Sequence, residues 1–578
     1  MTMNHQSIAA FIWSVADLLR GSYKQHEYGD IILPFTVLRR LDCVLAETKD
    51  QVLETSEQTG GMSVDLVDRQ LKRVSKLSFY NTSKYTMEKL KADPDNIAAN
   101  LGDYVRGFSS DALDIFDKFK FFDRIDSLNA NNLLFLLVSR FCTVDLGPDK
   151  VSDIEMGNIY ENLLRRFSEM SNETAGEHFS PRDGLELAVD LIIAGESDDL
   201  STDGRVVKVY DPCAGTGGAL SIFKDRVNEY YPQASVYCYG QEINPATYAT
   251  CKADILLRGG EAKNIEFGDT LTDPAFPDEN FGYQISNPPY GVDWKKEKRQ
   301  VEAEYKNDGS RGRFGAGLPR VSDGQLLFVE HMVSKMRPVG GGGGRIAVFM
   351  NGSPLFTGAA GSGESDIRKW LLHDLDLVEA IVAMPNDFFY NTGIATYIWV
   401  LNNNKTAERK GKVQLINANG MFTKMRKPLG SKRNELSGEQ IRAIVKEYEA
   451  FEESKTSKIF DVDDFGYTTV TVERPLRDEH GEIVKDRKNR PKPDSALRDT
   501  ENIPLGTDID EYFEREVKPY APDAWMDRKK DKVGYEIPFT RYFYEYTPLR
   551  PAAEILNDIK ALESSIADNL AKVVNKRD

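Results

Sequence analysis

The sequence feature that most restricts the fold is a β-rich run followed at once by a glycine-rich turn and a helix. The run is Val206–Tyr210, the turn is Asp211-Pro212-Cys213-Ala214-Gly215-Thr216-Gly217-Gly218, and a helical pattern continues to about Tyr230. Glycines in such a turn let the backbone approach a ligand closely, and the N-terminus of the helix favours the ligand's negative end. The pattern indicates an α/β fold, although dinucleotide enzymes also use such a turn and the glycine spacing here is not GxGxxG.

Three further predicted strands each end in a polar side chain. Val236–Gly240 runs into Gln241-Glu242, Ile265–Phe267 into Gly268-Asp269, and Tyr283–Ser286 into Asn287. An acid in the place of Glu242 typically takes ribose hydroxyls, and Asp269 is suited to accept from an adenine amino group. Parallel strands present their carboxyl ends at one crevice, so we expect a doubly wound, mostly parallel sheet with a ligand there.

The fourth strand delivers Asn287-Pro288-Pro289-Tyr290. Two prolines restrict the backbone, so the Asn287 side chain and the nearby carbonyls would be held in one geometry. Hydrogen bonds accepted by Asn287 Oδ1 and the Pro288 carbonyl from an aromatic amine would free the nitrogen lone pair for attack. Tyr290 would offer a flat face to a base swung out of a duplex. A lone four-residue match would more often be a proline-rich turn closing a strand.

Other segments near these strands suggest ligand contacts. Ser180 resembles a helix N-cap with Pro181 at the first helical position, where backbone N–H groups can receive a carboxylate. The aromatic stretch Phe388-Phe389-Tyr390 could complete a base sandwich, or could simply pack in the core. A basic segment follows Tyr290 and could become ordered on a phosphate backbone, although such a run is usually a solvated loop. Its cations are Lys295, Lys296, Lys298, Arg299, Lys306, Arg311, Arg313 and Arg320.

The periodicity predicts three parts: a helical N-terminal domain over 1–150, an α/β domain over 151–460, and a C-terminal part over 461–578. In the last part we expect a charged, proline-containing linker or arm, followed by a long amphipathic helix from about Pro551 to Lys576. Ile559, Leu562 and Ile566 belong to its apolar stripe. Such a stripe needs a partner surface, in its own chain or in another subunit.

The charge balance restricts how the chain could bind nucleic acid. It has 74 basic and 91 acidic residues, a net charge of −17, which is the wrong sign for a protein that grips nucleic acid with its whole surface. Any DNA contact must therefore be local or shared with a partner. The five cysteines form no CxxC pair and no cluster with histidine, so we expect neither disulfides nor a metal site. No basic and apolar leader and no apolar run of ~20 residues is present, so we expect a cytoplasmic protein.

The motif set resembles the γ-class N6-adenine DNA methyltransferases. It consists, in order, of Phe179-Ser180-Pro181, the turn from Asp211 to Gly218, Glu242, Asp269, Asn287-Pro288-Pro289-Tyr290 and Phe388-Phe389-Tyr390. The helical start, with Leu38-Arg39-Arg40-Leu41, makes the whole chain similar to the modification (M) subunit of a type I restriction–modification system. The resemblance covers about residues 5 to 460 well and the remainder loosely.

The resemblance implies a Rossmann-like methyltransferase fold, S-adenosylmethionine as cofactor and methyl transfer to the N6 atom of adenine in double-stranded DNA. Asn287, Pro288, Pro289 and Tyr290 would be catalytic, and Tyr290, Phe388 and Phe389 would stack on the base. The cofactor would contact Phe179, Ser180, Asp211, Pro212, Ala214, Gly215, Thr216, Gly217, Gly218, Glu242 and Asp269, and DNA would contact Lys295, Lys296, Lys298, Arg299, Arg311 and Arg313. The expected partners are a specificity subunit, a second M subunit and a restriction subunit.

Three alternatives stay open on the residues alone, of which the most distant is a nicotinamide dehydrogenase, since it explains the first glycine turn but not the Asn-Pro-Pro-Tyr turn. Asn-Pro-Pro-Tyr methyltransferases also modify glutamine amides in proteins and guanine amines in RNA, and a chain could keep the fold as a non-catalytic scaffold. The long helical start and the basic segment favour DNA, and the intact Asn287, Tyr290, Glu242 and Asp269 argue against a scaffold.

Overall fold

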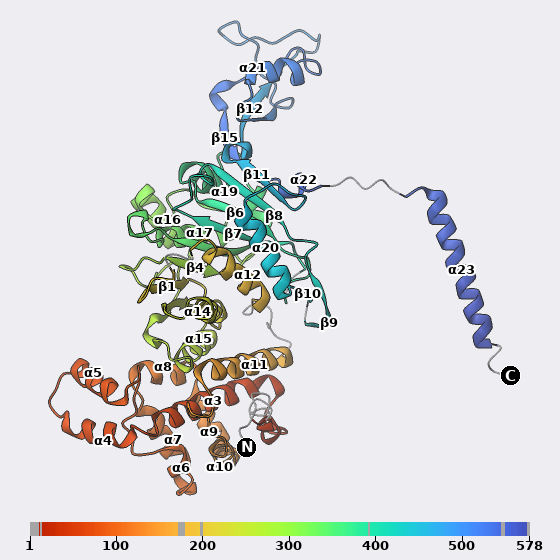
Figure 1. The fold of residues 1–578 in the computed structure, drawn as a ribbon. Helices are drawn as coiled ribbons and strands as arrows, with labels where there is room; N and C mark the ends of the chain where they lie inside the picture. The colour runs from red at the N-terminus through yellow and green to blue at the C-terminus, as the bar shows by residue number, and fades with distance from the viewer. Residues whose placement is uncertain are drawn as a thin grey trace. The chain divides into compact units, whose positions relative to one another are not determined.

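The computed structural model describes residues 11, 14–171, 180–196, 200–390, 393–429, 431–544 and 550–574. It divides into two compact units, Met1–Ile537 and Pro538–Asp578, and each is treated by itself. Figure 1 traces the chain through both. Within the described ranges, no helix combines the length and the apolar character needed to cross a membrane.

The first unit begins with helices, most of which contribute to one apolar core. Apolar residues at three- and four-residue spacing place one face of these helices against the core. The buried Arg40 anchors the segment that leads from these helices to the rest of the unit. Its guanidinium donates to the Val151 carbonyl at 2.8 Å and to Asp153 Oδ1 at 2.7 Å. The helices are α2 (Ala16–Leu19), α3 (Tyr28–Leu45), α4 (Lys49–Gln58), α5 (Val64–Ser75), α6 (Met87–Leu90), α7 (Ile97–Arg106), α8 (Ser110–Lys118), α9 (Phe121–Ala130), α10 (Leu134–Cys142) and α11 (Asp153–Ser171).

A nine-stranded sheet follows, in the order β11-β8-β6-β7-β5-β4-β1-β2-β3. Pairing is parallel from β3 through β2, β1 and β4 to β5 and between β6 and β8, whereas β7 runs antiparallel to β5 and β6, and β11 antiparallel to β8. The strands are β1 (Val206–Asp211), β2 (Ser235–Glu242), β3 (Ile265–Phe267), β4 (Tyr283–Ser286), β5 (Arg345–Asn351), β6 (Val378–Ala383), β7 (Thr396–Asn402), β8 (Lys412–Asn417) and β11 (Ser457–Asp461). This is the expected doubly wound, mostly parallel sheet.

Helices cover both faces of the sheet because its side chains alternate in direction. Val209 and Ile285 join the apolar core formed with α12, α14 and α20. Their neighbours on the strands point the other way: Gln284 Nε2 donates to the Met332 carbonyl of α17 at 2.8 Å. The helices of this part are α12 (Arg182–Ile193), α14 (Gly218–Tyr230), α15 (Pro245–Leu257), α16 (Lys298–Asp308), α17 (Gln325–Ser334), α18 (Ser353–Phe356), α19 (Gly363–Lys369) and α20 (Gly438–Ala450). Residues Ala253 and Leu256 of α15 also enter the core of the N-terminal helices.

The segment after residue 461 differs from the expected linker or arm. It contains a four-stranded sheet in which β12 (Gly466–Glu473) pairs antiparallel with β13 (Asp499–Pro504), β14 (Trp525–Met526) and β15 (Lys532–Tyr535), with the short helix α21 (Ile509–Tyr512). Only the stretch 474–498 keeps the arm-like character, being mostly exposed and held by isolated bridges. The sequence did not predict this sheet, because its β-rich runs are short, widely spaced and separated by charged and proline-containing segments.

The second unit contains α22 (Phe539–Tyr542) and α23 (Ala552–Val574). The latter is the expected helical C-terminal tail. Within this unit no described residue covers the apolar stripe: Ile559, Leu562 and Ile566 are 50%, 62% and 57% exposed.

Candidate active site

The glycine-rich turn leaves β1 and enters α14 with two residues in the left-handed region, Gly215 at φ +53° and Gly217 at φ +85°. Glycine is required at Gly217 for a second reason, because an added Cβ would lie 2.9 Å from Cys251 Sγ. The Ala214 N–H donates to the Gln241 carbonyl at 3.0 Å, which holds the turn against the end of β2.

The carboxylate of Glu242 braces this turn from the neighbouring strand. Its Oε2 accepts the Gly215 N–H at 2.8 Å, and its Oε1 accepts the Asn244 N–H at 2.8 Å. Asn244 in turn caps α15, since its Oδ1 accepts from the Ala246 N–H at 2.9 Å. Each carboxylate oxygen keeps a further lone pair for a ligand.

Asp211, at the end of β1, is almost fully buried and links two strand ends. Its Oδ1 accepts from Ser286 Oγ of β4 at 2.7 Å and from the Cys213 N–H at 2.9 Å. Burial raises the pKa of this carboxyl to about 7, against the lowering effect of those two hydrogen bonds. Asp269, after β3, is half-buried and accepts from the Leu271 N–H and from Thr272 Oγ1, each at 2.9 Å.

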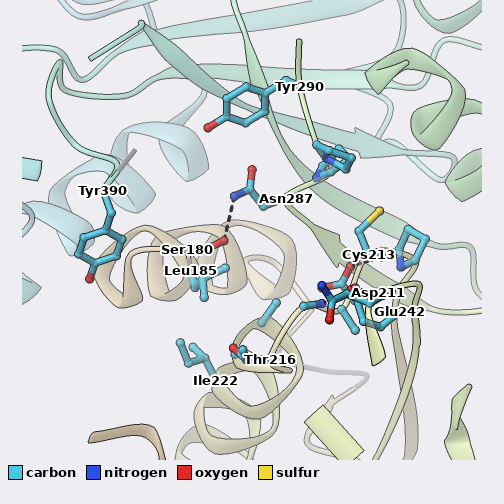
Figure 2. A pocket seen from close by; sticks show the side chains of 18 of the residues that line it. Ser180, Leu185, Asp211, Cys213, Thr216, Ile222, Glu242, Asn287, Tyr290 and Tyr390 are labelled. Atoms are coloured by element: carbon cyan, nitrogen blue, oxygen red, sulfur yellow. Dashed lines mark hydrogen bonds between the residues drawn. The ribbon is translucent and has the colours of Figure 1, made fainter. Parts of the chain in front are cut away.

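Asn287 leaves β4 with its two amide atoms in different situations. Nδ2 donates to Ser180 Oγ at 3.0 Å, as Figure 2 shows. Oδ1 is buried and accepts no hydrogen bond from any residue that the structure describes. A buried acceptor without a donor is costly, so this atom is a natural contact point for a ligand's N–H group. Three residues on, Tyr290 is half-buried, and burial raises the pKa of its phenol to about 12.

These groups surround one cavity of about 1450 Å³. Single-ligand pockets are usually ~300–1,000 Å³, so there is space for two ligands side by side. Of the residues expected at the site, the cavity is lined by Ser180, Asp211, Pro212, Ala214, Gly215, Thr216, Gly218, Glu242, Asp269, Asn287, Pro288, Pro289 and Tyr290. Gly217 is the exception in the turn, and Phe179 lies outside the described residues.

The expectation that Phe388 and Phe389 stack on a base is wrong for this conformation. Their exposed fractions are 1% and 2%, and both belong to the apolar core between the sheet and α12. The next residue, Tyr390, lines the cavity instead, and Figure 2 shows Tyr390, Tyr290 and Asn287 around the same pocket. The sequence of three adjacent aromatics does not reveal which one faces the cavity.

The basic segment after Tyr290 contains the helix α16 and contributes Trp294, Val301 and Phe314 to a small apolar core. Arg313, which was predicted to contact DNA, is engaged within the protein: its guanidinium donates to Glu304 Oε2 at 2.7 Å and to the Thr270 and Leu271 carbonyls at 2.8 Å each. The other predicted contact residues, Lys295, Lys296, Lys298, Arg299 and Arg311, are exposed.

Two features of the site were missed in the sequence. Lys432 is buried, bonds to both carboxylate oxygens of Asp183 at 3.1 Å and lies 3.8 Å from the Phe388 ring centroid. Two short strands, β9 (Thr423–Leu429) and β10 (Lys432–Glu435), bring Met425 and Lys427 to the cavity. The sequence is basic there, but no pattern in it predicts that this stretch reaches the site.

The sheet order, the turn and the Asn-Pro-Pro-Tyr segment at one crevice define the chain as a Rossmann-like methyltransferase that acts on an amine. In a comparison with protein families, the model for N-6 DNA Methylase matches residues 151–474 and that for the HsdM N-terminal domain matches residues 8–141. The chain therefore belongs to the N-6 DNA methylase family, as an adenine-specific DNA methyltransferase and modification subunit of the type I restriction–modification kind. The expected family, fold class and enzyme class are confirmed.

Relatives and solved structures agree. The MjaIX type I restriction enzyme methylase subunit of Methanocaldococcus jannaschii is 27% identical over 465 residues, which cover 76% of each chain. The HindI methylase subunit of Haemophilus influenzae is 28% identical over 270 residues, 46% of this chain and 54% of the relative. The crystal structure of a type I methyltransferase subunit from Streptococcus thermophilus matches with a TM-score of 0.63 at 20% identity, over 80% of this chain and 97% of that one, and supports the fold.

Proposed function

We propose that this site transfers the methyl group of S-adenosylmethionine to the N6 amine of an adenine that has been turned out of double-stranded DNA. The observation that carries the proposal is the buried Asn287 Oδ1, which lacks a donor among the described residues while its Nδ2 is anchored to Ser180. An acceptor fixed in this way can take a hydrogen bond from the target amine, whose nitrogen must become tetrahedral before it can attack.

The residues of the Asn-Pro-Pro-Tyr segment would prepare the amine. Its lone pair is delocalised into the base, and hydrogen bonds accepted by Asn287 Oδ1 and the Pro288 carbonyl favour a tetrahedral nitrogen. When bound, S-adenosylmethionine supplies an electrophilic methyl group, whose bond to sulfur breaks as the bond to nitrogen forms. The amine then loses one proton to solvent.

The turn side of the cavity fits the cofactor. Gly215 lets the backbone approach a ligand, Glu242 retains acceptor capacity for ribose hydroxyls, and Asp269 also lines the cavity. Asp211 is buried beneath the turn and would maintain the shape of the turn, without binding the cofactor strongly itself. On the other side, Tyr290 and Tyr390 would hold the base between their rings.

The remaining partners are proposals as well. A net charge of −17 gives the chain little sequence-independent attraction to DNA, so a specificity subunit would choose the sequence. One solved structure of similar fold, with a TM-score of 0.50, is described as the basis of complex assembly of a type I restriction–modification system. A second M subunit and a restriction subunit would complete such an assembly.

The proposal is tested by the product. The purified protein, with any subunits that accompany it, is incubated with isotopically labelled S-adenosylmethionine and either unmethylated DNA, ribosomal RNA or release-factor protein. Label in N6-methyladenine of DNA alone is expected. Label in a glutamine amide or a guanine amine would support one of the alternatives, which the family match does not favour.

A further inference from the structure

The strands β9 and β10 form an antiparallel ribbon that is separate from the central sheet. Figure 1 shows it projecting from the α/β body next to α20. Met425, Lys427 and Pro428 of this ribbon line the same cavity as Asn287 and Tyr290. The ribbon therefore stands at the entrance through which a base would reach the site.

The base of the ribbon is firmly attached to the loop that carries Tyr390. The Ser431 N–H donates to the Tyr390 carbonyl at 2.8 Å, the Arg433 N–H to the Asp387 carbonyl at 2.8 Å, and Asn434 Nδ2 to the Asn386 carbonyl at 2.7 Å. The buried pair of Lys432 with Asp183 adds an anchor to α12. A ligand bound to the ribbon would therefore be held at a fixed position relative to Tyr390 in the cavity wall.

The ribbon is strongly basic in an acidic chain. Residues 423–435 hold five basic side chains and one acidic one, against a net charge of −17 for the whole chain. Lys432 is paired with Asp183 inside the protein. The other four basic residues are exposed, and their side chains form no ion pair or hydrogen bond with a described residue: Lys424, Arg426, Lys427 and Arg433. Since side chains alternate along a strand, Lys427 and Met425 share the cavity face, while Lys424 and Arg426 lie on the opposite face.

We propose that this ribbon is the DNA-backbone contact of the chain, lying in a groove of the duplex beside the extruded adenine. This rests on the function proposed above. A duplex groove is lined by phosphates on both walls and admits a two-stranded ribbon, so cations on both faces of the ribbon match it. An acidic protein partner would place negative charge against one face of the ribbon only. Binding of such a partner would also not explain why the ribbon lies beside the base site.

The chain offers a matched control for a test. Lys424, Arg426 and Lys427 have the same types and the same spacing as Lys485, Arg487 and Lys488 in the exposed stretch 474–498, which does not line the cavity. Each set is changed to glutamine in the full-length protein with its accompanying subunits. Binding of a fluorescent duplex, selected because the wild-type protein binds it, is measured from about 50 to about 300 mM NaCl, since affinity for DNA falls steeply with salt over roughly this range.

We expect the ribbon variant to flatten the slope of log affinity against log salt by about 2–3, since each phosphate contact contributes about 0.9. Cofactor affinity and melting temperature should stay at wild-type values, and the control variant should keep the wild-type slope. An unchanged slope in the ribbon variant, equal effects of both variants, or loss of a protein subunit in place of DNA affinity would overturn the proposal. Where the triple variant misfolds, Lys427→Gln alone should flatten the slope by about 1.

The two proposals fail in different ways. DNA binding does not require methyl transfer, so a wild-type protein that binds the duplex without methylating it would contradict the proposed function. The comparison of salt slopes would still decide the role of the ribbon.

Discussion

Asn287 Nδ2 donates to Ser180 Oγ at 3.0 Å, which joins the end of β4 to the residue that precedes α12 by two positions. The bond determines which amide atom faces the cavity, because it occupies the nitrogen and leaves Oδ1 as the acceptor. Ser180 was expected to bind the cofactor, but its observed hydrogen bond points to a role in orienting Asn287.

The first prediction concerns this bond. Ser180→Ala should lower kcat for methyl transfer by about 5–10-fold, because a net contribution of about 1 kcal/mol per hydrogen bond would no longer favour the productive amide orientation. Cofactor affinity, measured by calorimetry, should change little, and Ser180→Thr should restore most of the rate. A loss of cofactor affinity with unchanged kcat would instead support the role expected from the sequence.

The second prediction is a pH dependence at Asp211. Its ordinary pKa is 3.8 and its folded pKa is about 7, so the unfolded chain releases the proton first as the pH rises. Asp211 should therefore make the folded state less stable as the pH goes from about 4 to 7, by up to about 4 kcal/mol, with no further change above. Asp211→Asn keeps an acceptor for Ser286 and removes this dependence. The difference in melting temperature between the two proteins should grow across that window; a constant difference would contradict it.

The third prediction separates the aromatic residues at 388–390. With a fluorescent adenine analogue at the target position, Tyr290→Ala and Tyr390→Ala should each reduce the brightening that accompanies extrusion, since stacking is worth about 1–3 kcal/mol per base. Phe388→Ala should act mainly on stability, at a cost of about 3–5 kcal/mol for a buried Phe. Equal brightening in the wild type and Tyr390→Ala would remove Tyr390 from the base site.

The sequence was most informative where backbone pattern and chemistry coincide. The strands that lead to Asp211, Glu242, Asp269 and Asn287 were located to within one or two residues, because each combines a β-rich run with a glycine or proline near its end. All four side chains line the cavity, as expected from the carboxyl ends of parallel strands.

Side-chain direction and long-range partners were harder to predict. Phe388 and Tyr390 are both aromatic, and only the packing against α12 decides that the first is buried and the second lines the cavity. Arg313 was grouped with exposed cations, although its partner Glu304 lies nine residues away and the carbonyls of Thr270 and Leu271 lie more than forty away. Composition does not encode such contacts.

The fourth prediction concerns the C-terminal helix α23. Replacing Ile559, Leu562 and Ile566 by Asp should abolish co-purification with a specificity subunit and site-specific methylation, because a helix in a groove concentrates its binding energy in a few apolar anchors. Cofactor affinity should be unchanged. A marked fall in melting temperature would show that the stripe packs on its own chain, and site-specific methylation by the single purified chain would contradict the need for a partner.

The central claim, that Asn287 Oδ1 accepts from the target amine, is tested most directly by single-turnover methyl transfer in Asn287→Ala with saturating S-adenosylmethionine. N6-methyladenine in DNA is quantified by mass spectrometry, and cofactor affinity is measured on the same protein. We predict a rate lower by about 10²–10³, by analogy with the loss of one preorganised hydrogen-bond partner, and a nearly unchanged cofactor affinity. Near wild-type turnover in this variant would contradict the claim.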